Sequence, residues 1–419
     1  MVSGELFATA YNFLTFSLSH LFSFFRNFAC ANQRERMIVG YDAKRIVRNG
    51  TGLGSYSRTL VNNLAETAAD SLELRLYAPD AGRDDLRCQI AQRPNIKWCY
   101  PKLKPQSSKL KALYWRSWGI VKDLVRDGVQ VYHGLSGELP TGLRKEGIRS
   151  VVTIHDLIFM RHPEYYSWID AKLYEWKFRR TVREADHIIA ISECTKRDIM
   201  ELGHVPEEKI SVIYQSYAPR FSQLLCPPRG TKGGLYILSV GTIEERKNAL
   251  LAVQALHYLP ENLSLVLVGR ATDYARKVRQ YADSHGLGER VVMLHNVTNE
   301  QLPQLYADAE AFVYPSRYEG FGIPIIEAIA MGLPVVAATG SCLEEAGGPH
   351  SLYVGPDDAE ALAAALRQVL RGAPGREERI AASRDYIRRF EGQDVARQVI
   401  DIYSRFLSLG GRSEENTKL

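Results

Sequence analysis

Two glutamates separated by seven residues are the first candidates for chemistry. They bound the run Glu319-Gly-Phe-Gly-Ile-Pro-Ile-Ile-Glu327, in which Pro324 lies where the first turn of a helix should begin. The N-terminus of such a helix presents free backbone N–H groups and a positive dipole, as a diphosphate requires. A buried carboxylate needs donors, and the hydroxyls of a sugar or ribose are suitable. Taken singly, Glu319 as a helix cap and Glu327 as a solvated charge are the simpler interpretations, but the whole string favours a site.

Two adjacent cations occupy the turn after the first predicted strand of the C-terminal half. The segment is Gly241-Thr-Ile-Glu-Glu-Arg246-Lys247-Asn248, and it opens a helix. Two cations at a strand-to-helix turn can bind a diphosphate and stabilise it as it leaves. If this turn stood alone, a solvated charge pair with a neighbouring glutamate would be the better interpretation.

The N-terminal half holds two weaker candidates. The segment Asn49-Gly-Thr-Gly-Leu-Gly-Ser-Tyr56 precedes an amphipathic helix, but a hairpin or a cap explains it equally well. A dinucleotide site is excluded by the spacing from the preceding strand. His155 follows the predicted strand Val151–Ile154, and side chains at that end of a parallel strand point into a ligand crevice. A core histidine is the usual alternative, and Asp156 is expected to orient a loop or the histidine.

The segment from Glu319 to Glu327, followed by Gly332-Leu-Pro-Val-Val, resembles the E-x7-E signature of retaining glycosyltransferases of family 4, glycosyl transferases group 1, with the GT-B fold. The resemblance covers nearly all of the chain from Met37 to about Leu407. It implies transfer of a hexose from a nucleoside-diphosphate sugar with retention of anomeric configuration. It also implies that no divalent metal and no further cofactor is needed.

The resemblance assigns roles to particular residues. It implies that Glu327 binds the ribose hydroxyls, that Glu319 faces the donor sugar and that Lys247 contacts the phosphates. Many family members have an arginine where this chain has Thr242, which leaves the number of phosphate contacts open. The expected catalytic residues are His155, Glu319 and Lys247. The expected donor-binding residues are Gly52, Gly54, Arg246, Lys247, Gly320, Phe321, Gly322 and Glu327.

The elements that must position these residues alternate short apolar runs, such as the predicted strand Leu263–Val268, with helical patterns, which is typical of βαβ units. The rhythm breaks at a Pro- and Gly-rich stretch and then restarts. We therefore expect an α/β protein of two Rossmann-like doubly wound domains facing across a cleft. The expected segments are an apolar extension (1–36), an acceptor-side domain (37–225), a linker (226–234), a donor-binding domain (235–390) and a C-terminal helix and tail (391–419).

The composition is that of a globular protein, with 45% hydrophobic and 24% charged residues. A net charge of +5 suits an anionic small ligand or membrane surface and is too weak to indicate nucleic acid. The six cysteines form no C-x-x-C pair, so neither a zinc site nor a disulfide framework is expected. Leu6 to Phe25 has no charged residue and is long enough to span a bilayer, although a start at Met37 explains it equally well.

The segment from Lys97 to Arg126 mixes basic and aromatic residues, which fits either an anionic membrane interface or a solvated helix face. We expect a cytoplasmic enzyme, on the inner face of the plasma membrane if it is anchored. The expected donor is a GDP- or UDP-hexose of mannose or glucose type. The expected acceptor is a saccharide or a lipid-linked saccharide in surface polysaccharide assembly. A sugar-nucleotide epimerase and a non-catalytic nucleotide-sugar-binding scaffold are the alternatives.

Overall fold

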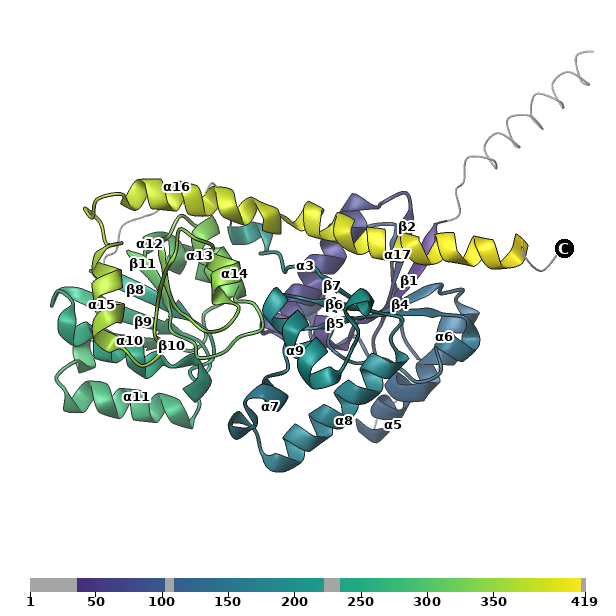
Figure 1. Cartoon of the computed structure of the whole chain (residues 1–419), viewed down its shortest axis with the longest axis horizontal. Coiled ribbons are helices and arrows are strands. Elements are labelled where there is room, and N and C mark those ends of the chain that lie inside the picture. Colours follow the sequence, from purple (N-terminus) through teal and green to yellow (C-terminus); the bar gives the residue numbers. More distant parts are fainter. Residues whose placement is uncertain (1–35, 102–108, 222–233, 416–419) are drawn as a thin grey trace, which may run out of the picture.

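The computed structural model describes residues 36–101, 109–221 and 234–415 of the 419-residue chain. Each half of the chain forms a parallel sheet with helices packed around it, and the halves lie side by side (Figure 1). The predicted fold class, two doubly wound α/β domains, is confirmed. Residues 1–35 of the predicted extension and 226–233 of the predicted linker lie outside the described residues.

The first sheet has seven strands in the order β3-β2-β1-β4-β5-β6-β7. In that order the strands are Ile96–Cys99, Leu72–Tyr77, Met37–Asp42, Val131–Gly134, Arg149–Ile154, His187–Ala190 and Ile210–Val212. The helices of this half are α2 (Lys44–Arg48), α3 (Gly52–Thr67), α4 (Asp84–Arg87), α5 (Lys109–Tyr114), α6 (Ile120–Arg126), α7 (Ile158–Arg161), α8 (Trp168–Glu184) and α9 (Glu193–Gly203). A π-helical turn, Trp115–Gly119, joins α5 to α6.

The second sheet has six strands in the order β10-β9-β8-β11-β12-β13. In that order the strands are Val291–Leu294, Leu263–Val268, Leu235–Val240, Ala311–Tyr314, Val335–Ala338 and Leu352–Val354. The helices are α10 (Ala249–Ala255), α11 (Asp273–Ser284), α12 (Leu302–Asp308), α13 (Ile323–Ala330), α14 (Leu343–Gly347), α15 (Ala359–Arg367), α16 (Arg376–Tyr386) and α17 (Gly392–Glu415).

The last helix, α17, returns to the first half of the chain. It runs from the second domain across to the first, where it packs on α3 (Figure 1). Val395, Val399 and Ile402 are buried in the core of the first domain at four- and three-residue spacing, which places them on one helical face. The Tyr403 hydroxyl meets Nδ1 of buried His133 at 2.5 Å. The C-terminal helix thus ties the two domains together.

None of the described helices combines the length and apolar character needed to cross a membrane. Leu6 to Phe25 lies outside the described residues.

Candidate functional site

The Arg246–Lys247 turn and the Glu319 loop meet where the strand order of the second sheet reverses. Strand β8 pairs with β9 on one side and β11 on the other, so the connections leaving β8 and β11 diverge to opposite faces. In open parallel sheets, ligands bind outside the carboxyl ends of the strands at such a switch point. The β8 connection carries Arg246 and Lys247, and the β11 connection carries Glu319.

Asn248 fixes the two connections to each other. Its φ of 56° is in the left-handed region, which asparagine tolerates better than most residues. Its side-chain amide donates to the carbonyls of Pro315, at 3.2 Å, and Pro356, at 2.7 Å. The backbone N–H of Arg317 also donates to the Arg246 carbonyl at 2.9 Å. The cations therefore stand on a rigid turn.

A buried carboxylate holds both cations. Lys247 Nζ binds Glu319 Oε1, and an Arg246 guanidinium nitrogen lies 3.0 Å from Glu319 Oε2. The Ser316 hydroxyl donates to Glu319 Oε1 at 2.6 Å, and Lys247 Nζ also donates to the Tyr314 hydroxyl at 2.6 Å. Four side chains thus surround one carboxylate, which is only 9% exposed.

The electrostatics of this cluster keep Glu319 ionised. Burial alone would favour the neutral acid, but the charges of Lys247 and Arg246 outweigh it and lower the pKa of Glu319 to about 2. Arg246 also pairs with the Glu244 carboxylate at 2.8 Å, so two carboxylates balance the two cations. An incoming diphosphate would meet two cations that are already positioned.

Glu327 has the opposite environment. It is the fifth residue of α13, is 7% exposed and accepts a hydrogen bond of 3.1 Å from the Tyr306 hydroxyl. Burial raises its pKa to about 7, against the opposing charge of Arg220 and the Tyr306 hydrogen bond. The same motif therefore supplies one firmly ionised carboxylate and one that titrates near neutrality.

Helix α13 begins where the sequence predicted a helix, but the side chain of Phe321 ahead of it does not face the site. Pro324 lies in the first turn, and Gly322 precedes the helix with a φ of 120°, where a side chain would be strained. Phe321 turns away into the core, where its ring packs against Tyr214 and Phe390 at centroid distances of 5.6 and 5.3 Å. Only the backbone of Phe321 is therefore available to a ligand.

Gly320 brings the second domain onto the first. A Cβ at this position would lie 1.9 Å from the carbonyl oxygen of His155, which only glycine permits. The Gly320 carbonyl accepts a hydrogen bond of 2.7 Å from the Ser192 hydroxyl, at the start of α9. The predicted sites of the two halves thus meet through backbone at this point.

The His155 ring is held by the protein at both nitrogens. Nδ1 accepts from the Gln215 amide at 3.0 Å, and Nε2 donates to the Leu135 carbonyl at 2.8 Å. Burial lowers the pKa of His155 to about 4, so the ring is neutral. Because both ring nitrogens of His155 are hydrogen-bonded within the protein, neither is available for proton transfer.

A second contact between the domains lies beside the first. The Glu345 carboxylate of α14 accepts from the backbone N–H groups of Glu193, at 2.7 Å, and Cys194, at 2.9 Å. A carboxylate from one domain thereby caps the first turn of α9 in the other. The Tyr318 hydroxyl, next to Glu319, donates to Asp198 in α9 at 2.5 Å.

The glycine segment of the first half differs from the prediction. It does not form a loop ahead of the helix, because α3 begins at Gly52 and both candidate glycines lie in its first turn. A Cβ on Gly54 would lie 1.8 Å from the Asn49 carbonyl oxygen, so this glycine is needed for packing. Gly52 is exposed, and a Cβ there would meet nothing within 4 Å.

A charged cluster in the first domain was missed. Strands β1 and β4 flank the switch point of that sheet, and Asp42 and Glu138 lie at or beyond their carboxyl ends. Arg116 pairs with both, at 2.9 Å to Glu138, and Lys177 lies 3.2 Å from Glu138. The sequence signal for this cluster is an acidic residue at or after each of two neighbouring strands. The cations that complete the cluster come from helical segments distant in sequence, so the sequence alone does not show the pairing.

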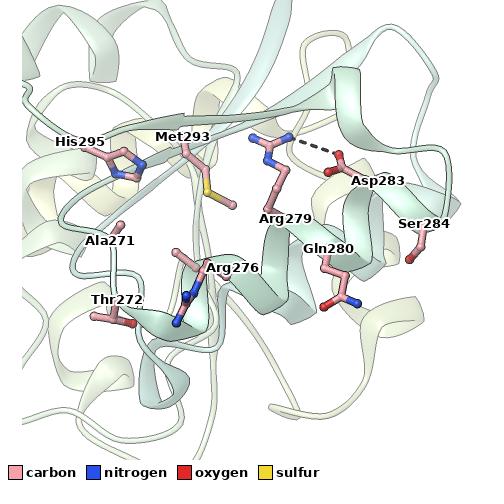
Figure 2. Close-up of a pocket in the computed structure, with 10 residues that line it drawn as sticks. Ala271, Thr272, Arg276, Arg279, Gln280, Asp283, Ser284, Met293 and His295 are labelled. Carbon is pink, nitrogen blue, oxygen red and sulfur yellow. Dashed lines mark ion pairs between the residues drawn. The ribbon is translucent and has the colours of Figure 1, made fainter.

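A separate pocket of about 860 Å³ lies along α11 (Figure 2). Arg276 and Arg279 of α11 stand on one side, with Met293 and His295 facing them from β10 and the residues after it (Figure 2). None of the predicted catalytic or donor-binding residues lines it. Among the described residues, no group of three or more His, Cys, Asp or Glu side chains is arranged to hold a metal ion.

Comparison with known proteins agrees with this geometry. The family model described as "Glycosyltransferase Family 4" matches residues 51–217, and "Glycosyl transferases group 1" matches residues 228–386. The O-antigen chain mannosyltransferase B of Escherichia coli is 29% identical over 386 residues, covering 84% of this chain and 96% of that protein. The O-antigen chain mannosyltransferase RfbU of Salmonella typhimurium is 29% identical over 339 residues, covering 80% of this chain and 90% of that protein.

The fold is shared with solved structures at lower sequence identity. A sucrose-phosphate synthase from Thermosynechococcus elongatus superposes with a TM-score of 0.73 at 21% identity, covering 89% of this chain and all of that one. Two family models span the two domains, and related mannosyltransferases match over most of their length. The chain therefore belongs to the family 4, group 1 glycosyltransferases of the GT-B fold.

Proposed function

We propose that this glycosyltransferase transfers a hexose, mannose in the first instance, from a nucleoside-diphosphate sugar to a saccharide or lipid-linked saccharide, with retention of configuration. The main support for a nucleoside-diphosphate sugar as the donor is the Arg246–Lys247 pair, which buried Glu319 holds at the switch point of the second sheet. The names of the two O-antigen mannosyltransferases support the sugar and a role in cell-surface polysaccharide assembly.

In the proposed reaction, the bond between the anomeric carbon and the phosphate oxygen breaks and its electron pair leaves with the nucleoside diphosphate. Lys247 and Arg246 stabilise the negative charge that grows on that oxygen. The acceptor hydroxyl oxygen forms the new bond on the same face of the sugar and gives its proton to the departing phosphate. This route needs no protein base, which suits a site where both His155 nitrogens are already bonded.

We assign Glu319 to positioning the two cations. Its oxygens are engaged by Lys247, Ser316 and Arg246, and its pKa of about 2 makes it a weak nucleophile. Glu327 would accept hydrogen bonds from the ribose hydroxyls, in line with the raised pKa of a carboxyl group that lacks a strong partner. No divalent metal is part of this proposal, since the cations are side chains.

The test is transfer from a panel of GDP- and UDP-hexoses in the presence of EDTA, followed by proton NMR of the product. We expect nucleoside diphosphate release that depends on an acceptor, with the same anomeric configuration in donor and product. An inverted product would contradict retention. Conversion of the donor without an acceptor would indicate an epimerase or hydrolase, and loss of activity restored by Mg²⁺ would contradict metal independence.

A further inference from the structure

Exposed apolar side chains are concentrated on two helical segments of the first domain. Fourteen large hydrophobic side chains are exposed among the described residues, and ten of them lie on α5–α6 or α8. Isolated exposed apolar residues are normal, but a concentration of this kind marks an interaction surface. The ten are Leu110, Leu113, Tyr114, Trp118, Val125, Trp168, Ile169, Leu173, Tyr174 and Trp176.

These residues are exposed although each helix already has a buried face. On α8, Phe178 and Val182 pack into the core, while Ile169, Leu173 and Trp176 follow one another at four- and three-residue spacing on an exposed face. On α5 and the π-helical turn, Trp115 is buried while Tyr114 and Trp118 are exposed, with their ring centroids 5.6 Å apart. Each segment thus carries a second apolar face.

The two segments lie on either side of one loop. Arg116 from the π-helical turn and Lys177 from α8 both bind Glu138. The Thr141 N–H donates to the Ser117 carbonyl at 2.9 Å, and Arg180 donates to the carbonyl of Leu139 at 3.1 Å. In Figure 1, α5 and α8 follow the same lower edge of the first domain. We call the exposed side of α5–α6 and α8 the aromatic–basic surface.

The charge of this surface differs from that of the rest of the chain. Its two segments carry ten basic and four acidic residues, out of 53 and 48 in the whole chain. Two of the basic residues, Arg116 and Lys177, pair with Glu138 and do not add to the exposed charge, which leaves eight basic residues against four acidic ones. Lys111, Lys122 and Arg183 of these segments are exposed. The guanidinium of Arg180 lies 5.5 Å from the centroid of the Trp176 ring. Basic side chains interleaved with tryptophan and tyrosine match an anionic bilayer interface.

We infer that the aromatic–basic surface binds an anionic lipid bilayer and holds the enzyme on it. The surface borders the proposed donor site, because the segment leading into α8 contacts the Glu319 loop: the rings of His162 and Tyr318 are 4.8 Å apart. A bilayer on this surface would present a lipid-linked acceptor next to the proposed reaction centre. The inference deepens the proposed function, but lipid binding is measured without donor or acceptor, so the two can fail separately.

The test is co-flotation of the full chain with vesicles, either phosphatidylcholine alone or phosphatidylcholine with 30% phosphatidylglycerol. We expect binding only to the anionic vesicles, and weaker binding at high salt. Each basic residue near an anionic bilayer contributes about 1 kcal/mol, which is about fivefold in affinity. The affinity of Lys111→Gln/Lys122→Gln for the anionic vesicles should therefore fall ~25-fold. In Trp118→Ser/Trp176→Ser, we expect a loss of at least about tenfold, since two amphipathic rings leave the interface.

Matched controls remove the same groups elsewhere. Arg270→Gln/Lys277→Gln removes two exposed charges of the second domain, and Tyr258→Ser removes an exposed aromatic ring of the same domain. These variants should bind like the wild type, and all variants should keep the thermal unfolding midpoint.

Failure of the wild type to bind anionic vesicles would overturn the inference. So would undiminished binding by both surface variants, which would point to another part of the chain. A concentration-dependent dimer that the Trp118→Ser/Trp176→Ser substitutions abolish would also overturn it, because the surface would then belong to a second copy of the chain.

Discussion

Replacing Glu327 with glutamine should stabilise the protein at alkaline pH and leave it unchanged at acid pH. Glu327 is buried, accepts a hydrogen bond from the Tyr306 hydroxyl, and has its pKa raised to about 7 by burial. The unfolded chain would titrate near the ordinary value of 4.5. Between these two values the folded protein binds more protons at this residue than the unfolded protein does. The contribution of Glu327 to stability therefore falls as pH rises from about 4.5 to about 7.

The size of the effect follows from the pKa difference. A pKa unit corresponds to 1.36 kcal/mol, so ionising the buried carboxyl costs about 3 kcal/mol above pH 7. Glutamine avoids that cost, and its carbonyl oxygen can still accept the hydrogen bond from the Tyr306 hydroxyl. For a domain of this size, the shift in the unfolding midpoint would be roughly 6–12 °C.

The assay is thermal unfolding of wild type and Glu327→Gln at pH 5 and pH 8, followed through the transition of the second domain. We expect the variant to exceed the wild type by only about 0.8 kcal/mol at pH 5, where the folded carboxyl is still protonated, and by about 3 kcal/mol at pH 8. A midpoint difference that is the same at both pH values would show that ionisation of Glu327 does not destabilise the folded protein. Because ribose hydroxyls favour the ionised acid, donor affinity of the wild type should also rise about tenfold from pH 6 to pH 8.

Three further substitutions, one of them with a matched control, test other parts of the site. Lys247→Ala should lower turnover ~10²–10³-fold, measured as nucleoside diphosphate release, and a rate within threefold of wild type would contradict its role. It should also lower the unfolding midpoint, because the buried Glu319 carboxylate loses one of its two cations. Gly320→Ala should abolish transfer because its Cβ would collide with the His155 carbonyl, whereas Gly52→Ala, the control, should keep the wild-type kcat/KM. Equal activity of the two variants would contradict the close approach of Gly320 to His155. Glu345→Gln should raise the donor KM about fivefold, from loss of ~1 kcal/mol at the α9 N-terminus; an unchanged KM would show that this contact does not contribute to donor binding.

The strands that carry the site were predictable because they are buried on both faces. Continuous apolar runs such as Leu263–Val268 gave bounds that match the structure. The two outermost strands that were missed, Ile96–Cys99 and Leu352–Val354, are short, and most of their residues are only partly buried. Their sequences therefore lack a distinctive apolar signal. The return of α17 to the first domain was also missed, because an amphipathic pattern does not say which core receives it.

Within the site, the motif located Glu319, Glu327 and Lys247, but not their partners. The ion pair between Lys247 and Glu319 joins residues 72 positions apart, which only the sheet topology brings together. The orientation of Phe321 toward the core depends on Tyr214 and Phe390, which are distant in sequence. Contacts between the domains, such as the one that the Glu345 carboxylate of α14 makes with the first turn of α9, carry no sequence signal at all.

A nucleoside-diphosphate sugar is proposed to bind at Lys247 and Glu327. A thermal-shift screen of GDP- and UDP-hexoses with wild type, Lys247→Ala and Glu327→Ala tests that binding. We expect at least one donor to raise the midpoint of the wild type, by an amount that grows with concentration, and to raise neither variant comparably. If no nucleotide sugar shifts the wild type, or if one shifts all three proteins equally, the donor does not bind at these residues.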